Sequence, residues 1–108
     1  MRTIIALGSN CNQEENISKA QTLLKQRFKN VKFSDRRWTE PIGITSDKFL
    51  NCIGTLETEM SLTQVIQCLK EIEQTMGDSH ENHQKGKVLI DIDLAQYGEK
   101  IVKEIIWL

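Results

Sequence analysis

The run VLIDIDLAQYG at residues 88–98 constrains the fold of this chain more than any other stretch. Apolar side chains recur there at every second position, which is the period of a β-strand with one buried face. The apolar positions are Val88, Ile90, Ile92 and Leu94. Asp91 and Asp93 alternate with them, so both carboxylates project from the opposite face of the strand. Two like charges this close repel each other, which costs stability unless a cation lies between them.

The composition is that of an ordinary globular protein and predicts one domain over residues 1–108. Fourteen Lys and Arg against fifteen Asp and Glu give a net charge of -1, which gives no indication of a nucleic-acid or membrane partner. Cys11, Cys52 and Cys68 are odd in number and lack the spacing of a metal site. They are therefore expected to be reduced thiols in the cytoplasm. The apolar run at residues 3–8 is too short for a signal peptide or a membrane span.

Periodicity elsewhere predicts alternating strands and helices. Strands are expected at 3–8, 31–38, 48–58 and 88–98, followed by a short hairpin, and helices at 13–28 and 62–76. Asn12 with Glu15, and Ser61 with Gln64, have the spacing of helix capping boxes. The polar residues 78–87 are expected to form a flexible loop. The order βαββαβ predicts an α+β fold, a ferredoxin-like sandwich in which two helices cover one face of an antiparallel sheet.

Strand parity then assigns residues to the two faces of the sheet. The face without helices is expected to carry Asp91, Asp93, Phe49 and Asn51. The helix-covered face is expected to receive Leu50, Cys52, Ile90 and Ile92. The sequence thus gathers polar and aromatic groups on one exposed surface.

Two carboxylates on that surface suit Mg²⁺, which takes oxygen ligands and completes its octahedron with water and phosphate. The alternative is a solvated strand face without a ligand. Phe49 and Asn51 form an aromatic and amide pair that could hold a flat heterocycle, with core packing of Phe49 as the alternative.

Gly8, Ser9 and Asn10 end the first strand, where free backbone N–H groups could approach a ligand or simply form a turn. His80 and His83 lack the further ligands that a zinc site needs. The sequence also contains no Walker A, GxSxG, GxGxxG or HExxH motif.

In their order along the chain, these motifs resemble the 6-hydroxymethyl-7,8-dihydropterin pyrophosphokinases. The motifs are GSN after the first strand, T-x-P-x-G leading to F-x-N, E-x-x-x-G at a helix end, and D-I-D-L on a strand. The resemblance spans essentially all 108 residues. It implies a ferredoxin-like core and an enzyme of folate biosynthesis that transfers pyrophosphate from ATP to a reduced pterin, using two Mg²⁺ ions.

The resemblance also implies roles for individual residues. Asp91 and Asp93 would be the catalytic residues that hold both magnesium ions. The pterin positions would be Gly8, Ser9, Asn10, Thr39, Ile42, Phe49 and Asn51. The nucleotide positions would be Glu73, His80, Lys85 and Lys87. ATP and the pterin would be the partners, and a protein partner is left open.

The chain departs from the family pattern at the positions that would bind the phosphates of ATP. Where the family has arginines and a tryptophan-glycine-proline run, this chain has Asp78, His80, Gln84 and Val88, and Lys85, Gly86 and Lys87. Because arginine grips phosphate with a planar, permanently charged fork, slower transfer than in other members is expected, by roughly 10³. Phe49 is also expected to be the one aromatic wall of the pterin site. The alternative is a non-catalytic module that binds magnesium-nucleotide, pterin or a protein.

Overall fold

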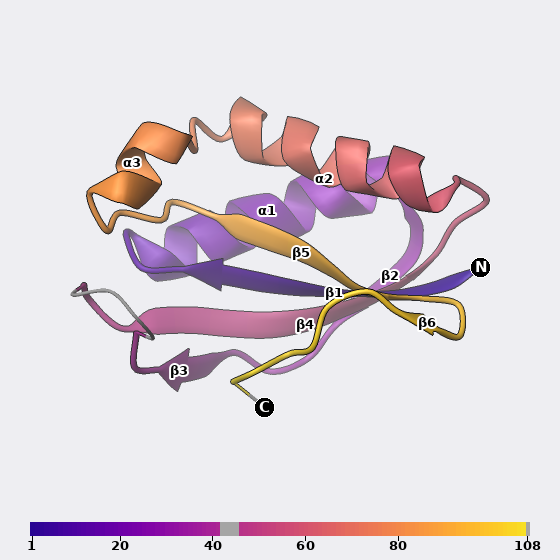
Figure 1. The fold of residues 1–108 in the computed structure, drawn as a ribbon, viewed down its shortest axis with the longest axis horizontal. Helices are drawn as coiled ribbons and strands as arrows, with labels where there is room; N and C mark the ends of the chain where they lie inside the picture. The colour runs from indigo at the N-terminus through magenta and orange to yellow at the C-terminus, as the bar shows by residue number, and fades with distance from the viewer. Residues whose placement is uncertain (42–45, 108) are drawn as a thin grey trace.

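The computed structural model describes residues 1–41 and 46–107, which form a sheet with helices above one face (Figure 1). The elements in chain order are β1 (Arg2–Ser9), α1 (Gln13–Arg27), β2 (Lys29–Phe33), β3 (Arg37–Thr39), β4 (Phe49–Glu57), α2 (Leu62–Thr75), α3 (His80–Gln84), β5 (Asp91–Tyr97) and β6 (Lys100–Ile101). In the described part of the chain, no helix is long and apolar enough to cross a membrane.

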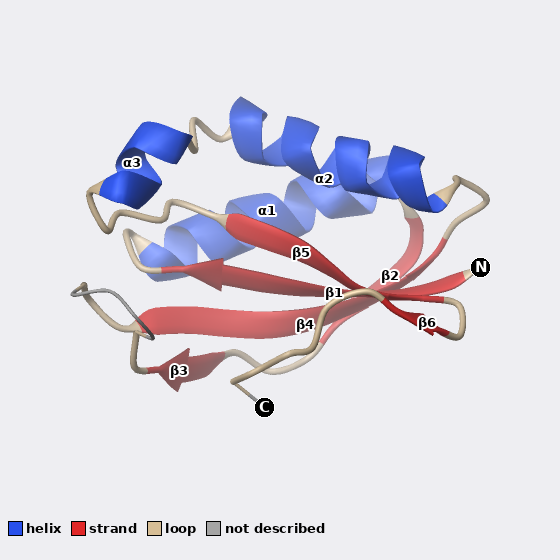
Figure 2. Cartoon of the chain, in the orientation of Figure 1, coloured by secondary structure: helices blue, strands red, loops and turns tan. Residues whose placement is uncertain are grey.

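The strands pair in the order β2-β4-β1-β5-β6, and β3 pairs with β4 beyond the end of β2. All the pairs are antiparallel. α1 and α2 lie on the same side of the sheet (Figure 2). The predicted α+β, ferredoxin-like class is therefore confirmed.

The strand predicted over residues 31–38 is two strands, and Ser34 explains the break. Its backbone N–H donates to the carbonyl oxygen of Ile53 at 2.8 Å, while its hydroxyl oxygen accepts from the Ile53 N–H at 2.8 Å. A side chain thus replaces one backbone acceptor, and the chain leaves the regular ladder before β3 begins.

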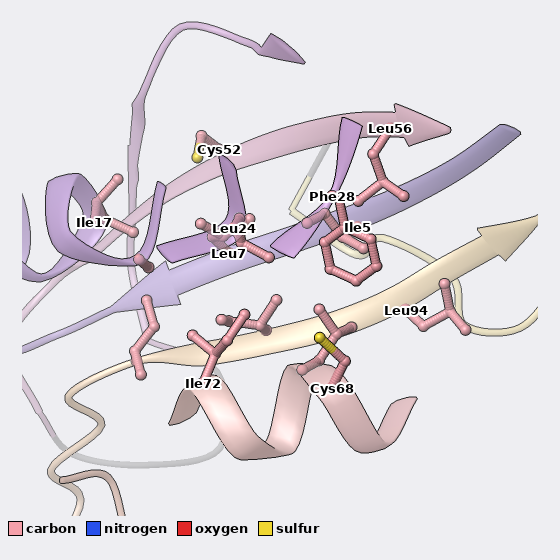
Figure 3. Packing of buried hydrophobic residues seen from close by; sticks show 14 of the residues in the cluster. Ile5, Leu7, Ile17, Leu24, Phe28, Cys52, Leu56, Cys68, Ile72 and Leu94 are labelled. Carbon is pink, nitrogen blue, oxygen red and sulfur yellow. The ribbon is translucent and has the colours of Figure 1, made fainter. Parts of the chain in front are cut away.

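The core lies between the helices and the covered face of the sheet (Figure 3). α1 contributes Ile17, Ala20 and Leu24, and α2 contributes Val65, Cys68, Leu69 and Ile72. The strand residues expected on this face, Leu50, Cys52, Ile90 and Ile92, are all buried. The parity prediction is therefore confirmed. A slip of one residue would move every side chain of a strand to the other face of the sheet, so a buried face fixes the register.

One of the two predicted capping boxes is present. The Ser61 hydroxyl accepts from Gln64 N at 3.2 Å, and Gln64 Oε1 accepts from Ser61 N at 2.9 Å. The capping box at Asn12 and Glu15 is wrong: Asn12 lies in the left-handed region at φ 45° and makes no side-chain cap.

The prediction that residues 78–87 form a flexible loop is also wrong. They contain α3, and Asp78 ties this segment to the start of β5. Its Oδ1 accepts from the N–H groups of Leu89 at 3.1 Å and Ile90 at 3.4 Å, while its Oδ2 lies 2.6 Å from His83 Nε2. The Asp78 side chain is 6% exposed, so these bonds form away from competing water.

We expect Ser61→Ala to lower the free energy of unfolding by about 1 kcal/mol, because both bonds of the capping box are lost. For a domain of this size that corresponds to a melting temperature about 5 °C lower in calorimetry. Thr63→Ala, at an exposed position in the same first turn, is the control and should leave stability unchanged or slightly higher. Equal losses in the two variants would contradict the cap.

Candidate active site

One row of residues crosses the open face of the sheet. In the strand register Gly8 on β1 lies opposite Asn51 on β4 and opposite Asp91 on β5. Residues paired in this way project from the same face. Because Gly8 has no side chain, the middle of the row is a hollow bounded by an amide on one side and a carboxylate on the other.

The hollow has a volume of about 250 Å³ and is lined mainly by residues of the open face. Its described walls are Ala6, Leu7, Gly8, Thr39, Glu40, Phe49, Asn51, Asp91, Asp93, Ala95 and Lys103, Glu104, Ile105, Ile106 and Trp107. The expected gathering of Asp91, Asp93, Phe49 and Asn51 on one concave surface is therefore confirmed. Both aspartates are partly exposed.

Asn51 is held in one orientation. Its Nδ2 donates to Thr39 Oγ1 at 2.7 Å and to the carbonyl oxygen of Arg37 at 3.3 Å. A carbonyl oxygen can only accept, so the NH₂ group must face β3. The amide oxygen Oδ1 then faces Gly8, where a Cβ atom would lie only 2.9 Å from it. The side chain thus offers a fixed acceptor to the hollow.

The two aspartates carry the charge that the sequence predicts. The pKa of Asp91 is raised to about 6, first by burial and then by the neighbouring Asp93 carboxylate, while Lys103 and His83 oppose the shift. A carboxylate of raised pKa marks negative charge that the surroundings do not fully compensate. The oxygen donors and the excess charge both suit a hard divalent cation.

The C-terminal residues 103–107 complete the hollow from outside the sheet. A bulge positions them: Leu94 pairs with Ile5 and Gln96 with Ile4, which leaves Ala95 without a partner on β1. The carbonyl oxygen of Ala95 accepts from the N–H groups of Val102 at 2.9 Å and Lys103 at 3.1 Å. The returning chain is thereby anchored beside Asp93.

Two residues of this segment were missed by sequence reasoning. Lys103 Nζ lies 3.0 Å from Asp93 Oδ2, and this bond raises the pKa of the ammonium group. Trp107 lines the same hollow as Phe49, so the expectation that Phe49 is the one aromatic available there is wrong. The apolar sequence around Trp107 was the available signal, whereas the position of Lys103 depends on the bulge.

Ser9 and Asn10, predicted beside the pterin, are not among the described residues that line the hollow. The Ser9 hydroxyl donates to the carbonyl oxygen of Cys11 at 3.0 Å. Asn10 accepts from Val88 N at 2.6 Å and donates to the carbonyl oxygen of Gly86 at 2.7 Å. Both side chains hold the end of β1 to neighbouring backbone. Ile42 lies outside the described residues.

Three of the predicted nucleotide residues, Glu73, Lys85 and Lys87, also lie outside the described lining. Glu73 on α2 accepts from the Ile92 N–H at 2.7 Å. Lys85 is exposed and pairs with Glu81 at 3.5 Å, and Lys87 is exposed. His80 is the first residue of α3.

The positions where the resemblance predicts arginine have structural partners here. Asp78 ties α3 to the start of β5, and Val88 is 8% exposed with its N–H bonded to Asn10. Arginine in place of Asp78 would lose its side-chain bonds, and a long charged side chain would be costly at the buried position of Val88. Within residues 1–41 and 46–107, no group of three or more His, Cys, Asp or Glu side chains could hold a metal ion. A metal at Asp91 and Asp93 would therefore take its other ligands from water and substrate.

Glu73 should make the folded protein less stable as the pH rises. The pKa of Glu73 is raised from 4.5 to about 7, mainly by burial and also by Asp91, Asp78 and Asp93, while the Ile92 N–H opposes the shift. When the pKa of a carboxyl group is higher in the folded than in the unfolded state, the folded protein loses stability as the pH rises from the lower to the higher of these two values. We expect Glu73→Gln, which keeps an acceptor oxygen, to reduce that loss by roughly 2 kcal/mol after allowance for solvent screening.

Denaturant unfolding at pH 5 and pH 8 would measure this difference. Asp91 acts in the same direction, so part of the pH dependence should remain in the variant. Glu59→Gln, at an exposed position before α2, is the control and should retain the full dependence. An unchanged pH dependence in Glu73→Gln would contradict the assignment.

Comparisons with known proteins agree with this geometry. The family model described as "7,8-dihydro-6-hydroxymethylpterin-pyrophosphokinase (HPPK)" matches residues 4–107. The chain is 32% identical over 105 residues to the "Folate synthesis bifunctional protein" of Arabidopsis thaliana, covering 94% of this chain and 22% of that protein. It thus spans about a fifth of the length of that relative. A match over nearly all of its residues shows that the chain belongs to the 7,8-dihydro-6-hydroxymethylpterin-pyrophosphokinase family.

Proposed function

We propose that this chain transfers pyrophosphate from ATP to 6-hydroxymethyl-7,8-dihydropterin, a step of folate biosynthesis. The observation that carries the proposal is the hollow that joins Phe49 and Asn51 to Asp91 and Asp93. A heterocycle at one end and a metal-bound polyphosphate at the other are the two partners that such a surface suits. Family membership supports the same reaction.

The pterin would lie between Gly8 and the aromatic side chains. The Oδ1 atom of Asn51 is a fixed acceptor for an N–H group at the edge of the ring, because Thr39 and Arg37 hold the NH₂ group away. Phe49 and Trp107 supply apolar surface to the same hollow. Each aromatic contact contributes about 1 kcal/mol beyond its burial.

Asp91 and Asp93 would hold Mg²⁺, to which their carboxylate oxygens are suited. When bound, the metal neutralises charge on the phosphates during transfer. A metal held by these carboxylates would keep the phosphates next to the pterin end of the hollow, since Asp91 and Asn51 lie on the two sides of Gly8. The transfer needs no protein nucleophile, because phosphoryl-type transfer depends mainly on positioning and electrostatics.

The further roles remain part of the proposal. Glu73, His80, Lys85 and Lys87 would act toward the nucleotide, and Ser9, Asn10 and Ile42 would shape the pterin side. The partners would be ATP and the pterin, in the cytoplasm, without nucleic acid or membrane.

A second candidate function is binding without turnover. It is favoured by the two positions where arginine is expected but where this chain has the hydrogen-bonded carboxylate of Asp78 and the buried side chain of Val88. Such a module would bind magnesium-nucleotide and pterin and transfer pyrophosphate slowly or not at all.

We expect Asp91→Asn to abolish magnesium-dependent ATP binding while the protein stays folded. The substitution removes a metal ligand but also removes the repulsion between Asp91 and Asp93, so stability at pH 8 should be unchanged or higher. Calorimetric titration with ATP and Mg²⁺ measures binding, and separation of labelled pterin products measures transfer. Glu99→Gln, an exposed carboxylate in the β5–β6 hairpin, is the control.

In this experiment, binding by the wild-type protein with transfer would support the pyrophosphokinase, and binding without transfer would support the second candidate. Absence of magnesium-dependent ATP binding would contradict both.

We expect Gly8→Ala to weaken pterin binding about tenfold without changing magnesium-dependent ATP binding. The new Cβ would lie 2.9 Å from Asn51 Oδ1, so the fixed amide must shift and lose its alignment with the ligand. Titration with 6-hydroxymethyl-7,8-dihydropterin measures the effect, and ATP binding by the same variant serves as its internal control. Unaltered pterin affinity would show that the ring does not lie over Gly8.

A further inference from the structure

Lys103 introduces positive charge into an acidic hollow. Of the described residues that line the hollow, it is the one with a cationic side chain, and the carboxylates among them are Glu40, Asp91, Asp93 and Glu104. Its Nζ atom lies 3.0 Å from Asp93 Oδ2. The ammonium group therefore already occupies one of the positions that a cation bound by Asp93 would take.

The ion pair is easy to exchange. The side chains of Lys103 and Asp93 are 60% and 33% exposed, and exposed pairs contribute about 1 kcal/mol or less. The main chain of Lys103 is held separately, by the hydrogen bond from its N–H to the carbonyl oxygen of Ala95. Its flexible four-carbon stem can therefore turn while the backbone stays anchored beside β5.

A divalent cation and the Lys103 ammonium group compete for the same carboxylate. Both seek the oxygen lone pairs of Asp93, and the doubly charged ion gains more from two carboxylates than a single ammonium group does. Once a metal takes Asp93, the ammonium group lies next to the metal and is repelled from its former position. A phosphate group on that metal would then offer the nearest strong acceptors, and lysine binds phosphate as a point charge.

We propose that Lys103 is a phosphate-binding residue that rests on Asp93 in the metal-free protein and is released to the polyphosphate when a divalent cation binds. The phosphate contact rests on the proposed function, whereas the exchange at Asp93 does not. Lys103 therefore opposes binding of the bare metal and favours binding of the metal with its nucleotide.

The variant Lys103→Met keeps an apolar stem and loses the charge. It should therefore raise the affinity for the bare metal and lower the affinity for ATP with its metal. Mn²⁺ alone, followed by electron paramagnetic resonance, should bind the variant about threefold to tenfold more tightly than the wild-type protein. ATP at saturating Mg²⁺, followed by calorimetry, should bind about tenfold more weakly. Lys103→Arg should restore both values toward those of the wild-type protein, since it keeps the charge.

Lys100→Met removes the same charge from an exposed position in β6 and is the control for a general change of net charge. Mn²⁺ affinity that is unchanged or lower in Lys103→Met would overturn the exchange at Asp93. Unchanged ATP binding in that variant, with tight binding by the wild-type protein, would overturn the phosphate contact and leave the proposed function intact. A wild-type protein that binds Mn²⁺ but no ATP would overturn the phosphate contact together with the proposed function.

Discussion

The unpaired outer edge of β5 is the constraint that the rest of the site depends on. In the described register β6 pairs with Gln96 and Tyr97 alone, so the first half of β5 has no strand on that side. Its backbone N–H groups need acceptors, since an unpaired polar group away from water is costly. Carboxylates supply them: Glu73 accepts from Ile92 in β5, and Asp78 accepts from Leu89 and Ile90, which lead into the strand.

The use of carboxylates as acceptors concentrates negative charge around the start of β5. Glu73 and Asp78 reach the edge from the helix layer, and Asp91 and Asp93 project from the other face. Burial raises the pKa values of both Glu73 and Asp91. Repulsion from Asp91, Asp78 and Asp93 contributes to the shift of Glu73, and repulsion from Asp93 contributes to that of Asp91. Asp91 and Asp93, which lie beside this edge, make the open face attractive to cations.

The fold could be predicted from the sequence because the side chains that face the core repeat with the period of their strand or helix. Alternation at Leu50, Cys52, Ile90 and Ile92 identified the helix-covered face, and the opposite parity placed Asp91 and Asn51 together. Where local hydrogen bonds override periodicity the predictions failed. The Ser34 hydroxyl divides a predicted strand, Asn12 takes a left-handed conformation, and Asp78 orders a segment whose composition is that of a loop.

The site was predictable to the extent that it lies on regular strands. Phe49, Asn51, Asp91 and Asp93 follow from strand parity, whereas Gly8 was expected only as part of the turn that ends the first strand. Lys103 and Trp107 do not, because a single extra residue at Ala95 directs the returning chain, and a bulge leaves no periodic signal in a sequence this short. Lys85 and Lys87 fall outside the described lining because α3 and Asp78 hold their segment against the start of β5.

Under the proposed function, this charge distribution makes nucleotide binding depend on the metal. The described lining of the hollow presents the carboxylates of Glu40, Asp91, Asp93 and Glu104 against the ammonium group of Lys103, so a bare polyphosphate would meet net repulsion. A divalent cation at Asp91 and Asp93 offsets the charge of these two carboxylates and also removes the partner of Lys103. One binding event thus converts a surface that repels phosphate into a surface with two sources of positive charge. The charges on β5 therefore require the metal to bind with or before the nucleotide. Pterin binding does not depend on the metal in this way, because the pterin end of the hollow has the neutral Asn51 and aromatic walls.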